Sequence, residues 1–84
     1  MARASRTILI VEDDAHARLA LEALVSSYGY TVKSAANGTD TLNVAAASEF
    51  EGVLLDLLLP DMNGLEVLRQ IRLLHPTVPI LILS

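Results

Sequence analysis

The sequence contains no cysteine and no tryptophan, only 4% aromatic residues, and few basic side chains. Without cysteine the chain forms neither a disulfide nor a thiolate metal site. Its 6 Lys and Arg against 10 Asp and Glu give a net charge of −4, which argues against a nucleic-acid surface in this segment. No apolar run approaches the roughly 18 residues of a membrane span, and no secretory signal is visible. We therefore expect a cytoplasmic segment with no direct nucleic-acid or membrane partner.

Apolar residues make up 52% of the 84 residues and fall into short blocks separated by turn residues. Their spacing predicts strands at 7–11, 30–34, 52–55 and 79–84, and helices at 15–28, 41–48 and 64–75. Strands that alternate with helices in this way require right-handed crossovers and a parallel sheet with helices on both faces. We expect one α/β domain with a doubly wound parallel sheet over residues 7–84, preceded by a leader over residues 1–6.

The same spacing predicts which side of each helix is buried. The first helix should bury the apolar residues Leu21, Leu24, Val25 and Tyr28, with Glu22 and Ser26 on the opposite side. The second should bury Leu42, Ala45 and Ala46. His16 and His75 have no further histidine or cysteine at metal-ligand spacing, so we expect both to be surface or cap residues.

Acidic residues follow two of the predicted strands directly. Asp56 ends the apolar run 52–55, and Glu12, Asp13 and Asp14 follow the first strand. A lone Asp after a strand is often only a cap, and acids at a helix start often only complement the helix dipole. However, burying an unpaired carboxylate is strongly unfavourable. We therefore expect Asp56 at the carboxyl end of its strand, where open α/β sheets bind ligands.

Parallel strands bring their carboxyl ends to one edge of a sheet, which places Glu12, Asp13, Asp56 and Ser84 on the same rim. Neighbouring carboxylates repel one another unless a cation lies between them. Mg²⁺ suits such oxygen ligands, and a backbone carbonyl such as that of Leu58 would complete its shell. An aspartate beside bound Mg²⁺ is placed to attack a phosphoryl group, and Ser84 would donate a hydrogen bond to the phosphoryl oxygens.

Three stretches, Ile8–Asp14, Val53–Gly64 and Pro79–Ser84, resemble the receiver domain of two-component response regulators. The resemblance implies a flavodoxin-like fold with strand order 2-1-3-4, and a phosphoryl group taken from a sensor histidine kinase or phosphotransfer protein. The implied role is signalling rather than conventional enzyme catalysis, although Mg²⁺-dependent self-phosphorylation from a small phosphodonor is compatible with it.

The resemblance also implies a role for each residue of the rim. Asp56 is similar to the family's phosphoacceptor and Ser84 to its switch hydroxyl. Asp13 resembles a direct Mg²⁺ ligand, whereas Glu12 is expected to act through water. Asp56 itself and the backbone carbonyl of Leu58 would complete the metal ligands.

The family pattern continues with a fourth helix, a fifth strand that ends in a lysine, and a fifth helix, and we expect a truncated receiver without them. Lys33 lies in the second strand and does not replace that lysine. The fourth strand, apolar on both faces, becomes an exposed edge that favours pairing with other chains. The alternative is therefore a non-signalling fragment that forms a homo-oligomer through this strand. A Mg²⁺-dependent phosphohydrolase would need a second general acid near Asp56 and a covering cap, and the sequence offers neither.

Overall fold

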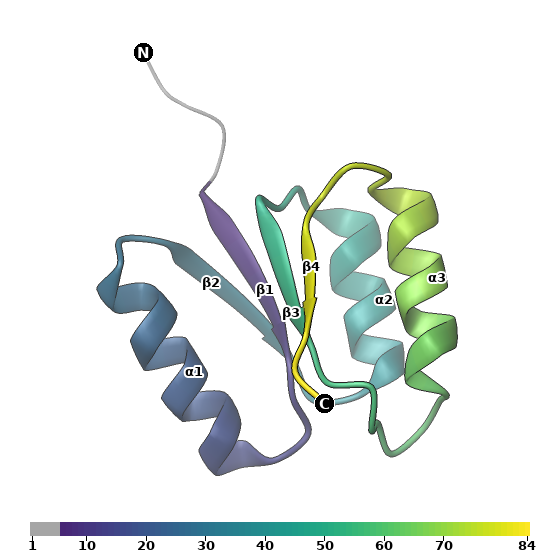
Figure 1. Ribbon diagram of the computed structural model, residues 1–84, viewed down its shortest axis with the longest axis horizontal. Coiled ribbons are helices and arrows are strands. Elements are labelled where there is room, and N and C mark those ends of the chain that lie inside the picture. Colours follow the sequence, from purple (N-terminus) through teal and green to yellow (C-terminus); the bar gives the residue numbers. More distant parts are fainter. Residues whose placement is uncertain (1–5) are drawn as a thin grey trace.

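Strands and helices alternate along residues 6–84, which are the residues that the computed structural model describes. The elements are β1 Thr7–Val11, α1 Ala15–Ser27, β2 Thr31–Ala35, α2 Gly38–Ala47, β3 Gly52–Leu55, α3 Gly64–Leu74 and β4 Ile80–Ile82. The four strands pair in parallel in the order β2-β1-β3-β4 (Figure 1). The predicted α/β class and strand order are confirmed. The bounds of β1 and β3 agree with the prediction, whereas β2 begins and ends one residue later.

The sheet separates two layers of helix. In Figure 1, α1 lies on one side of the strands and α2 and α3 lie on the other. The main core fills the space between the sheet and the α2–α3 layer, because alternate residues of the central strands point that way. Its buried members are Leu9, Val11, Ala45, Phe50, Val53, Leu55, Val67 and Ile71. Burying each large apolar side chain of this set contributes about 1.5–3 kcal/mol to folding.

Each helix begins at a polar side chain that caps it. Asp14, Asn37 and Asn63 are the N-cap residues of α1, α2 and α3. Each side-chain oxygen accepts a hydrogen bond from a backbone N–H two or three residues further along. The helix α1 ends before Gly29, whose φ of 93° lies in the left-handed region that glycine adopts without strain. These caps fix where each helix begins, and therefore which residues lie between the end of a strand and the start of the next helix.

The predicted buried face of α1 is wrong in part, because Leu21 and Val25 are half-buried but Leu24 and Tyr28 are not. Leu24 is 54% exposed and Tyr28 is 72% exposed, whereas Glu22 is half-buried and accepts a hydrogen bond from the Ser34 hydroxyl of β2. The reason is that α1 packs mainly on β1 and β2. Within residues 6–84 no second helix lies beside it over β3 and β4, so the side of α1 that faces this gap stays in solvent (Figure 1).

Two smaller predictions also need correction. We expected His75 to be a surface or cap residue. It is the C-cap of α3, but it is buried rather than on the surface. Its Nε2 donates to the carbonyl oxygen of Ala45, 2.7 Å away, and its ring meets Phe50 edge to face. In α2, Ala46 is exposed and Thr41 is buried instead, because Thr41 lies on the same side of the helix as Ala45.

The predicted leader lies outside the described residues, apart from Arg6. The Arg6 carbonyl accepts a hydrogen bond from the Thr31 N–H, and its guanidinium lies 4.9 Å from the centre of the Tyr30 ring. Arg6 therefore joins the end of the β1–β2 pair. None of the helices formed by residues 6–84 has the length and apolar character needed to cross a bilayer.

Candidate functional site

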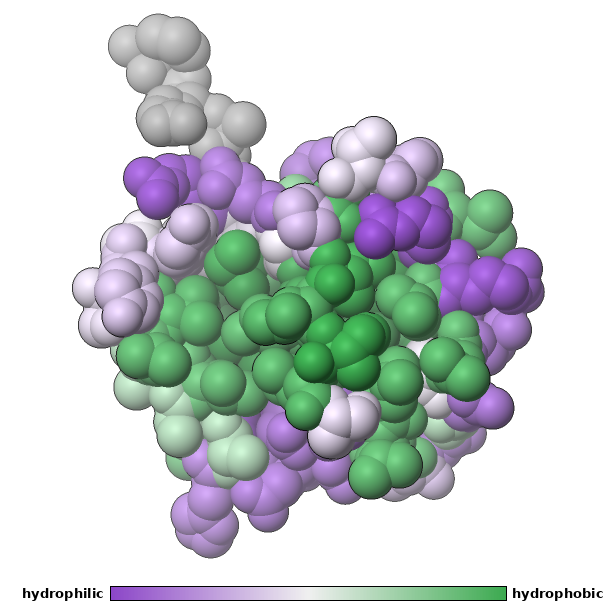
Figure 2. Space-filling view, in the orientation of Figure 1, coloured by the Kyte–Doolittle hydropathy of each residue, from purple (hydrophilic) through white to green (hydrophobic). Residues whose placement is uncertain are grey.

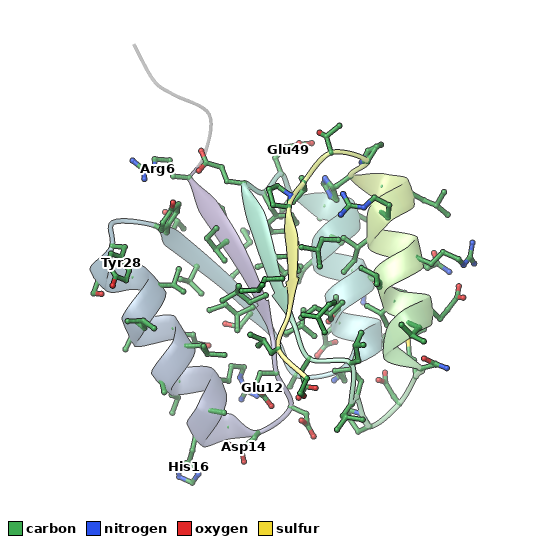
Figure 3. The ribbon with its side chains drawn as sticks, viewed as in Figure 1. Arg6, Glu12, Asp14, His16, Tyr28 and Glu49 are labelled. Atoms are coloured by element: carbon green, nitrogen blue, oxygen red, sulfur yellow. The ribbon has the colours of Figure 1, made fainter. Side chains whose placement is uncertain are left out.

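The carboxyl ends of β1, β3 and β4 form one rim of the sheet. The register pairs Val11 of β1 with Leu55 of β3, and the Asp56 N–H continues the ladder by donating to the Val11 carbonyl at 3.0 Å. This pairing carries Asp56 to the residues that follow Val11. Figure 3 shows Glu12 at this rim, close to the start of α1. The prediction that acids from two strands meet at one edge is therefore confirmed by the geometry.

Three carboxylates converge at the rim. Glu12, Asp13 and Asp56 each present an oxygen, and these three atoms lie within 4.8 Å of one another. Asp56 is only 7% exposed, Glu12 is half-buried and Asp13 is exposed. Burial raises the pKa of Glu12, the N–H of Asp14 works in the opposite direction, and the charge of Asp56 adds to the rise. The rim thus holds more negative charge in a small volume than it readily accommodates.

Two donors hold one oxygen of Asp56. Its Oδ1 accepts hydrogen bonds from the Leu58 N–H at 2.9 Å and from the Ser84 hydroxyl at 2.8 Å. Ser84 is placed by the sheet, since its carbonyl accepts from the Leu57 N–H and the preceding Leu83 N–H donates to Leu55. Ser84 therefore touches Asp56 directly, as its position at the end of the fourth strand predicts.

Leu58 lies in the loop that follows β3. Its side chain is 73% exposed, while its backbone forms an isolated bridge with Asn63 across the loop. The loop closes tightly where α3 begins, because a Cβ on Gly64 would lie 2.2 Å from the Leu57 carbonyl oxygen. The backbone of Leu58 is thus held next to Asp56 at one end of a compact turn.

Sequence reasoning missed Arg18. Its Nη1 donates to the backbone carbonyl of Glu12 at 2.9 Å and to that of Asp13 at 3.4 Å. The guanidinium therefore fixes the backbone that carries the acidic pair. Asp14 is the N-cap of α1, so the helix-start reading of the three acids is correct for Asp14, whereas Glu12 and Asp13 join the rim. An arginine one turn into a helix carries no sequence signal of such a contact.

The rim offers the ligand set of a hard cation. Its donors are carboxylate oxygens, without thiolate or imidazole, which suits Mg²⁺ or Ca²⁺ and not Zn²⁺. Within residues 6–84, no lysine or arginine forms an ion pair with the three acids. A divalent cation at this rim would reduce the mutual repulsion of the three carboxylates and would lower the pKa of Glu12.

Comparison with known proteins gives consistent matches. The family model of the response regulator receiver domain matches residues 8–84. The response regulator MprA of Mycolicibacterium vanbaalenii is 39% identical to the chain over 77 residues, which are 92% of the chain and 33% of that protein. The chain thus spans about a third of this curated relative.

Solved structures match over most of the chain. The receiver domain of the sensor histidine kinase PA1611 from Pseudomonas aeruginosa, with a magnesium ion coordinated in its active site cleft, is 32% identical. It has a TM-score of 0.88, covering 96% of this chain and 68% of that one. A response regulator from Burkholderia pseudomallei with a phosphorylated aspartic acid and a calcium ion has a TM-score of 0.88 at 28% identity. That match covers 93% of this chain and 46% of that one.

Proposed function

The chain belongs to the response regulator receiver domain family, and from this premise we propose that Asp56 accepts a phosphoryl group in phosphorelay signalling. The observation that carries the proposal is the placement of Asp56. It is a buried acid at the carboxyl edge of a parallel sheet, within ligand distance of two further acids and hydrogen-bonded to Ser84. The phosphorylated aspartic acid in the Burkholderia pseudomallei relative supports the same chemistry.

The transfer is a displacement at phosphorus. With Oδ1 of Asp56 held by Leu58 and Ser84, a lone pair on Oδ2 attacks the phosphoryl group of a phosphohistidine. An O–P bond forms as the donor's P–N bond breaks, and the imidazole leaves with a proton. With acetyl phosphate as donor a P–O bond breaks and acetate leaves. Ser84 then donates to a phosphoryl oxygen, which makes it the switch hydroxyl of the site.

We propose Glu12, Asp13, Asp56 and the Leu58 carbonyl as the residues that hold Mg²⁺. When bound, the ion neutralises charge on the phosphoryl oxygens as the transfer proceeds. The convergence of three carboxylates supports this assignment, as does the magnesium ion in the Pseudomonas aeruginosa receiver. Arg18 keeps the backbone of the acidic pair in place, and so would help to hold both side chains at the rim.

The proposal is tested by intact-mass spectrometry after incubation of the chain with acetyl phosphate. A gain of one phosphoryl group is expected in Mg²⁺, none in excess chelator, and none in the Asp56→Asn variant with or without the ion. Circular dichroism of both proteins confirms that each is folded. An unchanged mass in a folded wild-type sample would contradict the proposal.

The family supplies the wider setting of this segment. Receiver domains are signalling modules, and we propose a sensor histidine kinase or phosphotransfer protein in the cytoplasm as the phosphodonor. Residues 7–84 would form the receiver segment, with residues 1–6 as a leader. Since the chain spans about a third of MprA, any output activity belongs to the larger proteins in which such segments occur.

We also propose that the chain self-associates through β4. The comparisons lend this no support; the observation that favours it is the exposed apolar edge. Leu81 is 61% exposed, and Figure 2 shows apolar residues gathered across the middle of the face on which β4 lies. Sedimentation velocity over a range of concentrations tests this, and a monomer at every concentration would rule it out.

A further inference from the structure

Asp61 links two loops that are far apart in the sequence. It lies in the loop between β3 and α3, yet its carboxylate accepts three hydrogen bonds from the first turn of α2. Oδ1 accepts from the Gly38 N–H at 2.7 Å, and Oδ2 accepts from the Thr39 N–H at 3.0 Å and the Thr39 hydroxyl at 2.9 Å. A carboxylate at a helix N-terminus is also favoured by the helix dipole. The loop is thus attached to α2 by a bidentate, charge-assisted contact.

The neighbouring residue strengthens the attachment. A Cβ on Gly38 would lie 2.5 Å from both Cγ and Sδ of Met62, so the Met62 side chain rests directly on the Gly38 backbone. Met62 also packs against the main core. Asp61 and Met62 therefore attach the part of the loop that precedes α3 to the start of α2. Asp61 does so through hydrogen bonds and Met62 through van der Waals contact.

The near side of the same loop carries the proposed site. Leu58 donates its N–H to Asp56 and pairs with Asn63 across the loop. A displacement of residues 61–63 would therefore be passed through the Leu58–Asn63 bridge to the backbone beside Asp56. The chain of contacts runs from α2 through Asp61 to the bridge, and from the bridge to the phosphoacceptor.

We propose that Asp61 is a positioning residue for the metal site, which holds the Leu58 backbone in place by anchoring the β3–α3 loop to the start of α2. This inference rests on the proposed Mg²⁺ site, because the Leu58 carbonyl is one of its assigned ligands. Asp61 itself is not one of the three converging carboxylates. Its effect on the ion is exerted through the backbone.

The competing interpretation is that Asp61 only caps α2. The helix already has its own N-cap, since Asn37 accepts from the Asp40 N–H at 2.8 Å. The two residues cap the same turn, but only Asp61 belongs to the loop that carries Leu58. Asn37→Ala is therefore a matched control for Asp61→Ala. Each variant removes a cap from α2, and only Asp61→Ala releases the loop.

The experiment is a titration with MgCl₂ alone, followed by the amide NMR signals of Asp56 and Leu58, in the wild type, Asp61→Ala, Asp61→Asn and Asn37→Ala. We expect Asp61→Ala to weaken Mg²⁺ binding by about tenfold, the lower end of the range found for outer-shell partners of metal ligands. Asn37→Ala should bind within about twofold of the wild type. Asp61→Asn keeps one acceptor oxygen and should restore part of the affinity.

Equal affinity in Asp61→Ala and the wild type would overturn the inference, as would an equal loss in Asn37→Ala. If Asp61→Ala does not fold, the comparison of Asp61→Asn with Asn37→Ala decides in the same way, with the loss expected only in the former. A wild type that binds no Mg²⁺ would instead refute the metal site itself. That outcome is distinguishable from a failure of the Asp61 inference, because a wild type without Mg²⁺ binding has no affinity for a variant to lower.

Discussion

At Asp56 a buried carboxylate is made tolerable by two hydrogen-bond donors. An unpaired charge at 7% exposure would cost several kcal/mol, and the Leu58 N–H and the Ser84 hydroxyl offset part of that cost. The same donors orient the carboxylate toward the open side of the rim. Stability and reactivity at this residue therefore depend on the same two contacts.

The Ser84 hydroxyl contributes to this orientation, so its removal should slow phosphorylation. In Ser84→Ala, Asp56 keeps the Leu58 donor but loses the one at 2.8 Å. A hydrogen bond of about 1 kcal/mol corresponds to a roughly fivefold lower rate of Mg²⁺-dependent phosphorylation by acetyl phosphate. Ser84→Thr retains the hydroxyl and should stay near the wild-type rate. If both variants react equally fast, the hydroxyl does not serve the reaction.

Asp61 should make folding stability depend on pH. Hydrogen bonds from the Gly38 and Thr39 N–H groups lower its pKa below the ordinary 3.8. An acid whose pKa is lower in the folded state stabilises the fold above its unfolded pKa, and this stabilisation is lost as the pH falls through the folded pKa. Urea unfolding should therefore show the wild type more stable than Asp61→Asn at neutral pH, with the gap closing below 3.8. A gap that is unchanged in acid would contradict the assigned contacts.

The β3–α3 loop is the element that decides the geometry of the site. The Leu58 N–H of this loop donates to Asp56 at one end, and the Asp61 carboxylate accepts from the Gly38 N–H of α2 at the other. The loop also returns so closely that Gly64 lies against the Leu57 backbone. Because Gly64 faces backbone atoms of Leu57, no flexible side chain could move aside to make room for a larger residue there. The loop is therefore sensitive to any added bulk at Gly64.

Gly64→Ala should be strongly destabilising, while Gly38→Ala should not. A Cβ on Gly64 would lie 2.4 Å from Leu57 Cα, and relieving that clash requires backbone movement worth about 2–3 kcal/mol of unfolding free energy. A Cβ on Gly38 would meet the Met62 side chain, which can rotate away at smaller cost. Urea unfolding of both variants measures the difference. Equal losses would mean that the loop adapts more freely than its contacts indicate.

The positions of the strands and helices, and the meeting of the acidic residues, were predictable from sequence for different reasons. Strand and helix positions follow from local spacing and caps, as the agreement at β1 and β3 shows. The meeting of Asp13 with Asp56 follows from topology, since parallel strands share one carboxyl edge. The contacts of Asp61 with Gly38, and of His75 with Ala45, join residues 23 and 30 positions apart. Residue type alone gives no signal of such contacts, and they were not predicted.

At the scale of the whole molecule, the two faces of the sheet are covered unequally. Among residues 6–84, two helices pack on one face, and a single helix packs over β1 and β2 on the other (Figure 1). This imbalance explains both the exposed apolar side of α1 and the exposure of Leu81 on β4. The prediction of a buried face on α1 failed at Leu24 and Tyr28, because helical spacing identifies an apolar side but not whether a neighbour covers it.

A charge placed on the open edge should reduce self-association. Leu81→Lys puts a cation on β4, where any chain that pairs with the strand would have to desolvate it. Leu73→Lys makes the same change at a similarly exposed leucine on α3 and serves as the control. Sedimentation velocity should show a smaller average mass for Leu81→Lys than for the control. The same mass for both variants would exclude β4 as the contact.

The measurement that tests the central claim most directly locates the phosphoryl group within the chain. Borohydride reduces an aspartyl phosphate to homoserine, so peptide sequencing by mass spectrometry identifies the modified residue. After incubation with acetyl phosphate and Mg²⁺, we expect homoserine at position 56 alone. Homoserine at Asp13 or another acid, or none in a folded sample, would contradict the assignment of Asp56 as the phosphoacceptor.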